Sequence, residues 1–234
     1  MLTVATFQAL DKKECPDFLK KIAIAVECFH KASLIHDDIE DQEEHRYEEF
    51  ALYRRHGIPV ALNVGDYLIG LGYDLLSSCG LCSEKVLKML QIAAKSHTTL
   101  CEGQGEELAW REKISYLSLE KLLSIFQEKT APAFSVALLL GALAANASEE
   151  ICQILKKYSD FLGIAYQIQD DIEDSRQEGN LLSLSHPSLF VALALENRGE
   201  EERAFLLDFL SKKISDKEEE RARGILQSKK IQEK

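Results

Sequence analysis

The pentapeptide Asp-Asp-Ile-Glu-Asp occurs twice, beginning at Asp37 and at Asp170, and each copy ends a long and largely apolar stretch. In a helix, residues four apart lie on one face, so Asp37 and Asp41 would be neighbours, as would Asp170 and Asp174. Carboxylates seldom point toward a protein interior unless a partner offsets their lost hydration. Magnesium prefers such hard oxygen ligands and completes its shell with water and phosphate. The repeat therefore predicts a Mg²⁺ site, with two solvated acidic helix ends as the alternative.

The helical face that carries each acidic pair is expected to point inward. Traced back in steps of three and four residues, this face passes through Ser33, His30, Val26 and Ile22 in the first copy, and through Tyr166 and Leu162 in the second. Each acidic pair would then lie near the C-terminal end of an amphipathic helix.

Composition limits the possible classes of protein. A chain of 234 residues with 46% hydrophobic residues can bury one sizeable core, so a single domain over residues 1–234 is expected. A formal net charge of −11 argues against nucleic acid and anionic membranes as partners. The longest nearly apolar run, Ala131 to Ala145, contains Pro132 and is too short to span a bilayer. Because the N-terminus also lacks the basic region of a signal peptide, a cytoplasmic protein without a transmembrane segment is expected.

The chain is expected to be all-α, because it has few turn signals and no run with a strand-like alternation. Expected helices run from Pro16 to about Gln42, Pro59 to Ser78, Ser83 to about Cys101, Ser118 to Phe126, Pro132 to Ala145, Glu149 to Asp174 and Ser188 to Asn197. Beyond Glu200 the sequence is strongly charged, and the tail after Ser215 is expected to be a solvated helix or a frayed end.

The six cysteines are too few for a dense disulfide framework in a chain of this size, so buried thiols are expected. Cys79 and Cys82 have the spacing of metal ligands, and His97 and Cys101 follow one helical turn apart. A structural zinc site is therefore an alternative role for these residues, although a single CxxC is a weak signal.

Several ordered motifs resemble those of the trans-isoprenyl diphosphate synthases, also called polyprenyl synthetases. That family carries two DDxxD motifs facing each other across an all-α cavity, and the two pentapeptides match them. Further matches, in chain order, are His30, Gly65-Asp66-Tyr67-Leu68 for GD-x-L, Gly103-Gln104 and Glu107-Leu108 for GQ-x-x-D-L, Lys129-Thr130 with Gly141-Ala142 for KT...GA, and Tyr166-Gln167 for FQ. The resemblance covers about residues 22–195 and implies the isoprenoid-synthase helical bundle with a central cavity.

The resemblance implies ionisation of an allylic diphosphate, followed by attack of isopentenyl diphosphate on the allylic cation and loss of a proton. Mg²⁺ held by Asp37, Asp41 and Asp170 would neutralise the diphosphate. Asp38, Asp171, Asp174 and Lys129 complete the implied catalytic set, and the implied substrate-binding residues are His30, Arg46, Gln104, Thr130 and Gln167. Family members are usually homodimers, so a homodimer is expected.

The sequence also departs from the family pattern. Where the family has RRG-x-PT-x-H, this chain has Arg46-Tyr47-Glu48, so the second arginine, used for isopentenyl diphosphate, is absent. The GK-x-x-RP segment would precede Leu2, so the chain is expected either to be truncated at its N-terminus or to lack that half-site. Downstream, residues 185–188 read Ser-His-Pro-Ser, which places His186 where GK-x-T has its lysine. Arg54 and Arg55 are an alternative source of positive charge, or else simply solvated.

These departures leave three functions open. The favoured one is a synthase, the second is a class I terpene cyclase, which needs only the ionisation step, and the third is a non-catalytic or heteromeric subunit. Two intact acidic copies favour catalysis. Ala32 occupies the place where short-chain family members carry an aromatic floor, and Phe29 lies one turn deeper. The synthase is therefore expected to make C20 to C25 products.

Overall fold

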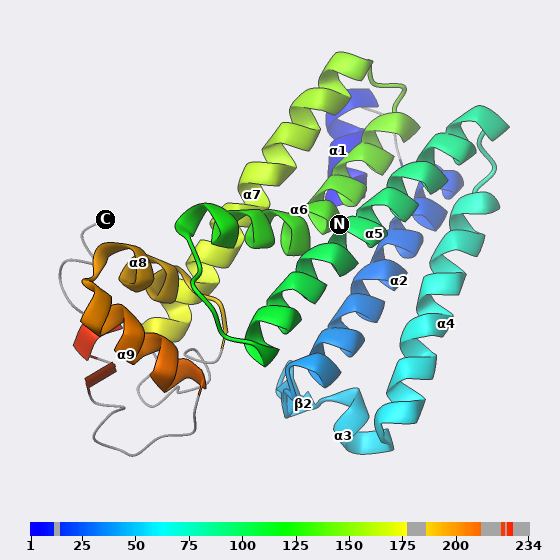
Figure 1. The fold of residues 1–234 in the computed structure, drawn as a ribbon. Helices are drawn as coiled ribbons and strands as arrows, with labels where there is room; N and C mark the ends of the chain where they lie inside the picture. The colour runs from blue at the N-terminus through cyan, green and yellow to red at the C-terminus, as the bar shows by residue number, and fades with distance from the viewer. Residues whose placement is uncertain (12–14, 177–185, 212–220, 223, 227–234) are drawn as a thin grey trace. The chain divides into compact units, whose positions relative to one another are not determined.

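The computed structural model describes residues 1–11, 15–176, 186–211, 221–222 and 224–226. These residues form α-helices and one short hairpin (Figure 1), which confirms the all-α fold class. The elements are α1 Leu2–Asp11, α2 Asp17–Glu40, β1 His45–Arg46, β2 Glu49–Phe50, α3 Leu52–His56, α4 Ile58–Ser77, α5 Ser83–Glu112, α6 Leu119–Ala144, α7 Glu149–Arg176, α8 Leu189–Asn197 and α9 Glu200–Ser211.

Local backbone chemistry sets several of these boundaries. Pro16 precedes α2 in an extended conformation, with φ −72° and ψ 160°. The antiparallel hairpin of β1 and β2 turns through Tyr47 and Glu48, whose φ angles of 51° and 67° are both positive, as a type I′ turn requires. Gly57 separates α3 from α4 with a φ of 87°, a conformation that glycine adopts without steric cost.

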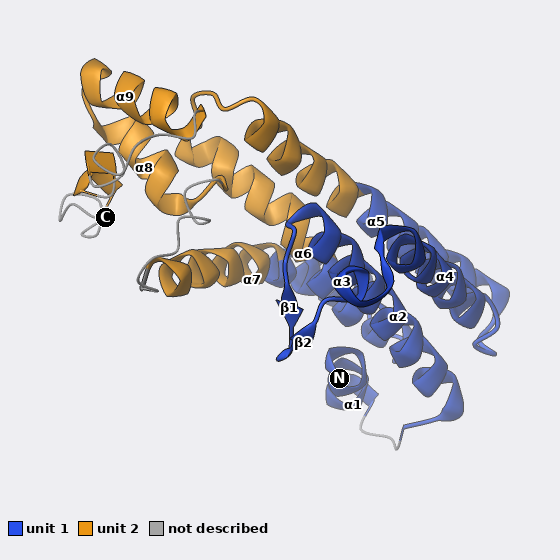
Figure 2. Cartoon of the chain, turned by 90° about the horizontal axis from the view of Figure 1, so that it is seen from below, with its two compact units in different colours: residues 1–98, 133–159 blue, residues 99–132, 160–234 orange. Residues whose placement is uncertain are grey.

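The chain divides into two compact units (Figure 2). Unit 1 comprises residues 1–98 and 133–159, and unit 2 comprises residues 99–132 and 160–234, so α5, α6 and α7 contribute residues to both. The core of unit 1 includes Phe7, Leu19, Ile22, Leu76 and Met89, each 1% exposed or less. Unit 2 has its own core, built from α8 and from neighbouring parts of α5, α6 and α9, with Trp110, Phe126, Leu195 and Leu206 among its buried members.

Three expectations about the elements were wrong. The helix expected to end near Cys101 continues to Glu112, and the two helices expected on either side of Pro132 form the single helix α6. The C-terminal tail was expected to be solvated, yet Ala222, Ile225 and Leu226 are buried in the core of unit 2. The rest of the tail, residues 212–220, 223 and 227–234, lies outside the described residues.

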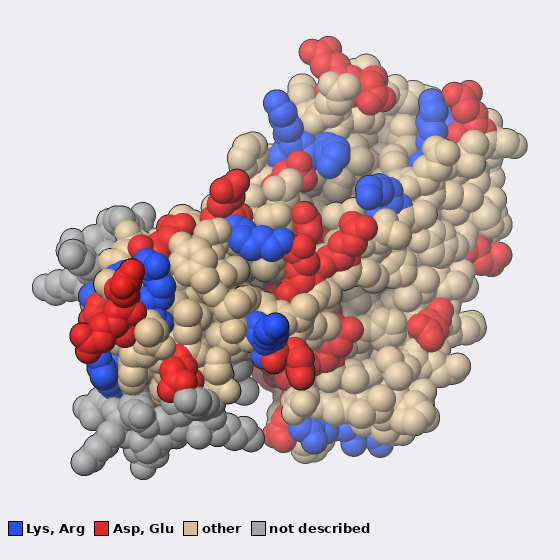
Figure 3. Space-filling model, in the orientation of Figure 1, with Lys and Arg blue, Asp and Glu red and all other residues tan. Residues whose placement is uncertain are grey.

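Charge is unevenly distributed over the surface of unit 1. Asp66 and Asp74 are the charged residues of α4, and Figure 3 shows a mostly uncharged surface over that helix. Val60, Leu62 and Tyr67 contribute exposed apolar side chains to it. Within the described ranges, every helix is either too short or too polar to cross a bilayer.

Candidate functional site

The first acidic copy lies at the C-terminal end of α2 in unit 1. Its second member, Asp38, is only 3% exposed, whereas Asp37 and Asp41 are half-buried. The Nε of Arg46 donates to Oδ1 of Asp38 at 2.8 Å, and Nη2 of Arg46 contacts the same oxygen. Burial opposes the charge on Arg46, but the bond to Asp38 and the nearby Asp37 and Glu43 raise the pKa of the guanidinium. A permanent cation therefore lies beside the first acidic copy.

The inward-facing stripe expected along α2 was partly wrong. Ile22 is buried, but His30 is exposed, and its partial desolvation lowers the pKa of the imidazole. The face of α2 that enters the core instead carries Leu19, Ile22, Ala25, Cys28, Ala32 and Asp38. Consequently the buried carboxylate of the pentapeptide is its second one, because Asp38 rather than Asp37 follows the core-facing stripe.

Ala32 and Phe29, the residues expected to set product length, lie where α2 packs against α4. Ala32 is 1% exposed. The ring of Phe29 meets the ring of Tyr73 edge-on, with centroids 5.0 Å apart. A Cβ added to Gly72 would lie 2.5 Å from Cε1 of Phe29, so only glycine leaves room for this ring. Two adjacent residues of α4, Gly72 and Tyr73, therefore pack against Phe29.

A second close contact between α2 and α4 lies directly beside the first acidic copy. A Cβ on Gly65 would lie 2.2 Å from Nε2 of His36, the residue that precedes Asp37. The same nitrogen is 3.8 Å from Oδ1 of Asp66. The Gly65-Asp66 motif thus accommodates the histidine next to the first acidic copy, a contact that the sequence pattern did not indicate.

The basic residues after the hairpin make surface contacts. Arg54 pairs with Glu44 at 3.5 Å and Arg55 with Glu49 at 4.0 Å, and all four side chains are largely exposed. Such pairs contribute little to stability, about 0–1 kcal/mol each. Their contacts therefore give no sign of a buried anion site at Arg54 and Arg55.

The second acidic copy lies near the end of α7 in unit 2. Burial and repulsion from Asp174 and Glu173 raise the pKa of Asp170, while Lys129 acts in the opposite direction. Burial raises the pKa of Asp171 to about 6, although the backbone N–H of Leu189 donates to its Oδ2 at 2.6 Å. Asp174 and Tyr166 are exposed, so Tyr166 does not face inward as expected, and Leu162 is half-buried. Crowded, partly desolvated carboxylates of this kind favour a nearby cation.

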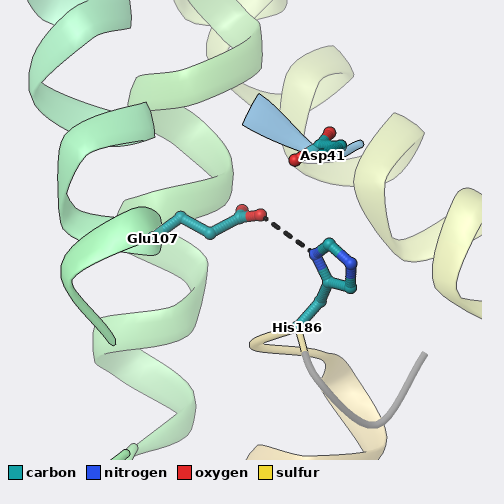
Figure 4. A group of neighbouring side chains, drawn as sticks. All are labelled: Asp41, Glu107 and His186. Atoms are coloured by element: carbon teal, nitrogen blue, oxygen red, sulfur yellow. Dashed lines mark ion pairs between the residues drawn. The ribbon is translucent and has the colours of Figure 1, made fainter. Parts of the chain in front are cut away.

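Lys129 and His186 converge on Glu107 in unit 2. Glu107 is 1% exposed, and its Oε2 accepts a hydrogen bond from Nζ of Lys129 at 2.5 Å. Figure 4 shows His186 pointing toward the same carboxylate, with Nδ1 3.6 Å from Oε1, and Arg111 contacts that oxygen as well. Burial would raise the pKa of Glu107, but His186, Lys129 and Arg111 together hold it well below its usual range. Glu107 was expected only as a motif position, and its buried charge could have been suspected from the basic residues at Arg111 and Lys129.

Two glycines fix the part of α6 that carries Lys129. A Cβ on Gly103 of α5 would lie 2.5 Å from the backbone nitrogen of Lys129, and a Cβ on Gly163 of α7 would lie 2.6 Å from that of Ala131. The α6 backbone therefore approaches both neighbouring helices closely at the Lys129-Thr130 motif. This close packing places Lys129 near Glu107 and the second acidic copy.

The remaining expected residues are less informative. Gln104, Thr130 and Gln167 are half-buried in unit 2. Cys79 is buried in the core of unit 1 and Cys82 is exposed, and both are free thiols. Ser185, part of the segment that departs from the family pattern, lies outside the described residues.

Known proteins resemble this chain over almost its whole length. The Polyprenyl synthetase family model matches residues 1–226. The short chain isoprenyl diphosphate synthase of Methanocaldococcus jannaschii is 29% identical over 234 residues, covering 96% of this chain and 70% of that protein. The crystal structure of geranylgeranyl pyrophosphate synthetase from Pyrococcus horikoshii has a TM-score of 0.82 at 27% identity, covering 99% of this chain and 73% of that one. A polyprenyl synthase from Caulobacter crescentus, complexed with calcium and isoprenyl diphosphate, has a TM-score of 0.79 at 28% identity, covering 96% and 69%.

The chain is shorter than these proteins. It spans 70, 62 and 60% of the length of three curated relatives, so it covers less than two thirds of two of them. The family model nevertheless matches nearly every residue, and the matched structures share the helical fold. The chain therefore belongs to the polyprenyl synthetase family.

Proposed function

We propose that this protein condenses an allylic diphosphate with isopentenyl diphosphate to give a longer trans-prenyl diphosphate. The observation that carries the proposal is the pair of intact acidic copies in a chain of this family, each on a helix and each accompanied by a basic residue. Arg46 accompanies the copy on α2, and Lys129 the copy on α7. The relatives named as isoprenyl and geranylgeranyl diphosphate synthases support the same assignment over a cyclase or an inactive subunit.

Mg²⁺ is the proposed metal, with Asp37, Asp41 and Asp170 as its ligands. The residues fit this ion, because all three offer hard carboxylate oxygens and the raised pKa of Asp170 reflects burial and the repulsion of neighbouring acids. When bound, Mg²⁺ would neutralise the charge that develops on the leaving diphosphate. Calcium accompanies isoprenyl diphosphate in the Caulobacter crescentus enzyme, which supports a divalent cation in the family site.

The chain's own residues would bind and orient the substrates. Arg46 and Lys129 would contact the diphosphate oxygens, so that pyrophosphate leaves with the electron pair of the broken C–O bond. The double bond of isopentenyl diphosphate would then attack the allylic cation to form the new C–C bond, and the resulting carbocation would lose a proton to form the double bond of the product. His30, Gln104, Thr130 and Gln167 are proposed to assist in substrate binding, as the family motifs imply.

Product length is proposed to depend on the contact between α2 and α4. Ala32 would leave the tail path open near the first acidic copy, and Phe29 would close it one turn deeper. The bracing of Phe29 by Tyr73 and Gly72 supports a fixed floor at that depth. C20 to C25 products are therefore proposed, and one curated relative is named a geranylgeranyl diphosphate synthase.

The assembly and location expected from the sequence remain proposals. A homodimer is supported by the exposed apolar side chains of α4, and a cytoplasmic location by the family resemblance. A single functional domain is proposed, in which both units serve one reaction. The absent second arginine is proposed to weaken binding of isopentenyl diphosphate, and the histidine in place of lysine at position 186 is proposed to weaken binding of pyrophosphate.

The test is a product assay with purified protein and Mg²⁺. Geranyl, farnesyl and geranylgeranyl diphosphate are each supplied with and without isopentenyl diphosphate, and released pyrophosphate and extracted products are measured. Chain extension that requires isopentenyl diphosphate is expected. Hydrocarbon or alcohol formed without isopentenyl diphosphate would indicate a cyclase, and no turnover in any mixture would reject the synthase.

A further inference from the structure

Among the described residues of unit 2, Glu107 is the most enclosed carboxylate that contacts basic groups. Its side chain is 2% exposed, and Lys129, Arg111 and His186 approach it with side chains 19, 16 and 31% exposed. One negative charge thus faces two permanent cations and an imidazole. Desolvation offsets much of the attraction within such a buried cluster, so stability alone is a weak explanation for it.

His186 reaches this carboxylate because its segment is anchored on both α7 and α8. The hydroxyl of Ser188 accepts a hydrogen bond from the backbone N–H of Val191 and so caps α8. At the next residue the chain is tied to α7, since the Leu189 N–H donates to Oδ2 of Asp171. These bonds hold the residues that follow His186 and direct its ring toward α5.

Without Glu107, the basic groups around it would repel one another. Lys129 and Arg111 both contact its carboxylate, so their ammonium and guanidinium groups are only a few ångströms apart. Repulsion between two like charges at such a separation amounts to several kcal/mol at an effective dielectric constant near 20. Loss of the carboxylate should therefore make Lys129 and Arg111 move apart, and it would also remove the group that pairs with His186.

We propose that Glu107 is a positioning residue that holds Lys129 and His186 together as one binding site for a diphosphate group. Glu107 itself does not touch the anion. It accepts from Lys129 and pairs with His186, which leaves the remaining donor capacity of both residues for phosphate oxygens. The inference rests on the proposed function for the identity of the anion.

The pairing also connects two places where this sequence departs from the family motifs. Glutamate is one methylene longer than the aspartate of GQ-x-x-D-L, and histidine is shorter than the lysine of GK-x-T. Because Glu107 and His186 are in contact, the longer acid compensates for the shorter base. Each residue is therefore expected to depend on the other.

Binding of inorganic pyrophosphate in the presence of Mg²⁺, measured by calorimetry, tests the proposal without turnover. Glu107→Gln should weaken binding about tenfold, equivalent to about 1.4 kcal/mol. If Glu107 acted only as a nearby negative charge, its neutralisation would tighten binding instead. The matched control is Glu106→Gln, because Glu106 lies next in the same helix but pairs with the exposed Lys121 at 2.5 Å. This control should leave pyrophosphate affinity unchanged.

A double-mutant cycle tests the dependence on His186. His186→Ala should weaken pyrophosphate binding about fivefold in the wild type and less than twofold in the Glu107→Gln background. Independent effects of the two substitutions, or tighter binding by Glu107→Gln, would overturn the proposal. Fluorescence of Trp110, the single tryptophan, checks folding of each variant.

A second pair of variants tests the same proposal if Glu107→Gln does not fold. Glu107→Asp alone should weaken binding, and Glu107→Asp combined with His186→Lys should restore it to within about twofold of wild type. Failure to recover would also overturn the proposal. If the double-mutant cycle shows the expected coupling but the wild-type protein turns over no allylic diphosphate, the proposed function is rejected while this inference is retained.

Discussion

At the scale of single residues, the two identical pentapeptides share one asymmetry. In both copies the second aspartate is bound within the protein, Asp38 to Arg46 and Asp171 to the Leu189 N–H. The partners differ in kind, since one is a guanidinium and the other a backbone amide. The shared position therefore reflects helix geometry, which turns the second aspartate toward its own unit. The first and last aspartates of each copy are four residues apart and lie together on a different face of the helix from the second.

The raised pKa of Asp171 predicts a pH dependence of stability. A folded-state pKa of about 6 exceeds the unfolded value near 4, so the native state holds this proton more tightly. The resulting stabilisation is complete below about pH 4 and is lost as the pH rises through about 6. Asp171→Asn keeps an oxygen for the Leu189 N–H but carries no charge. In EDTA, the variant should be more stable than the wild type by about 2 kcal/mol at pH 7.5, and this difference should vanish near pH 4, where Asp171 of the wild type is protonated.

Urea unfolding at several pH values measures this difference. EDTA removes divalent cations that would otherwise stabilise the ionised carboxylate. A constant difference between the two proteins from pH 4 to pH 7.5 would contradict the raised pKa.

Phe29 is predicted to limit product length. Phe29→Ala removes the ring that Tyr73 and Gly72 hold in place, so the prenyl chain would extend by at least one five-carbon unit before it meets a side chain. Chromatography of the dephosphorylated products measures the shift. Phe18→Ala serves as the control, because Phe18 packs against Phe7 in the core of the same unit. Longer products from both variants would point to general loosening of unit 1 and not to a floor at Phe29.

At the scale of helices, α6 shows how tertiary packing overrides a local signal. Pro132 removes a backbone donor and would be expected to break a helix, yet α6 continues from Leu119 to Ala144. Close approach of α5 at Gly103 and of α7 at Gly163 supports the helix just before this proline. The result is one helix that carries the Lys129-Thr130 motif in its middle.

Alanine at Gly103 and at Gly105 is predicted to have opposite effects. Both glycines lie in α5, but a Cβ at Gly103 would lie 2.5 Å from the α6 backbone, whereas Gly105 has nothing within 4 Å. Gly103→Ala should lower the free energy of unfolding by about 2 kcal/mol, since a backbone must shift. Gly105→Ala should raise it by about 0.5–1 kcal/mol, because alanine is the better helix former. Chemical denaturation measures both, and equal effects would reject the close packing.

The local sequence pattern predicted most helices, but it failed where contacts between residues far apart in the chain determine the structure. The helices that start after Pro16 and at Glu149 were placed well, because a proline marks the first start, Ser148 caps the second, and the apolar spacing begins at both. The burial of Asp38 could not be predicted, because it depends on Arg46 returning through a hairpin whose turn residues, Tyr47 and Glu48, carry no glycine signal. Similarly, the contact of His186 with Glu107 joins residues far apart in the chain. The acidic copies were found from sequence because they repeat, but their partners were not.

At the scale of the whole molecule, the proposed reaction needs both units. The first acidic copy and Arg46 belong to unit 1, whereas the second copy, Lys129 and Glu107 belong to unit 2. Each unit has its own hydrophobic core, and α5, α6 and α7 run from one unit into the other. A helix that belongs to both cores links their stability. Neither acidic copy is therefore expected to support turnover alone.

Asp37→Ala and Asp170→Ala are each predicted to abolish pyrophosphate release from an allylic diphosphate, with a loss of at least about 10³-fold in rate. One substitution lies in unit 1 and the other in unit 2. Both positions are on helices and outside the apolar cores, so the circular dichroism spectrum and the melting temperature should change little. Asp74→Ala is the matched control, because Asp74 is an exposed aspartate on α4, and its activity should equal that of the wild type. Retained turnover in either aspartate variant would mean that one acidic copy suffices for ionisation, and the proposed set of metal ligands would be rejected.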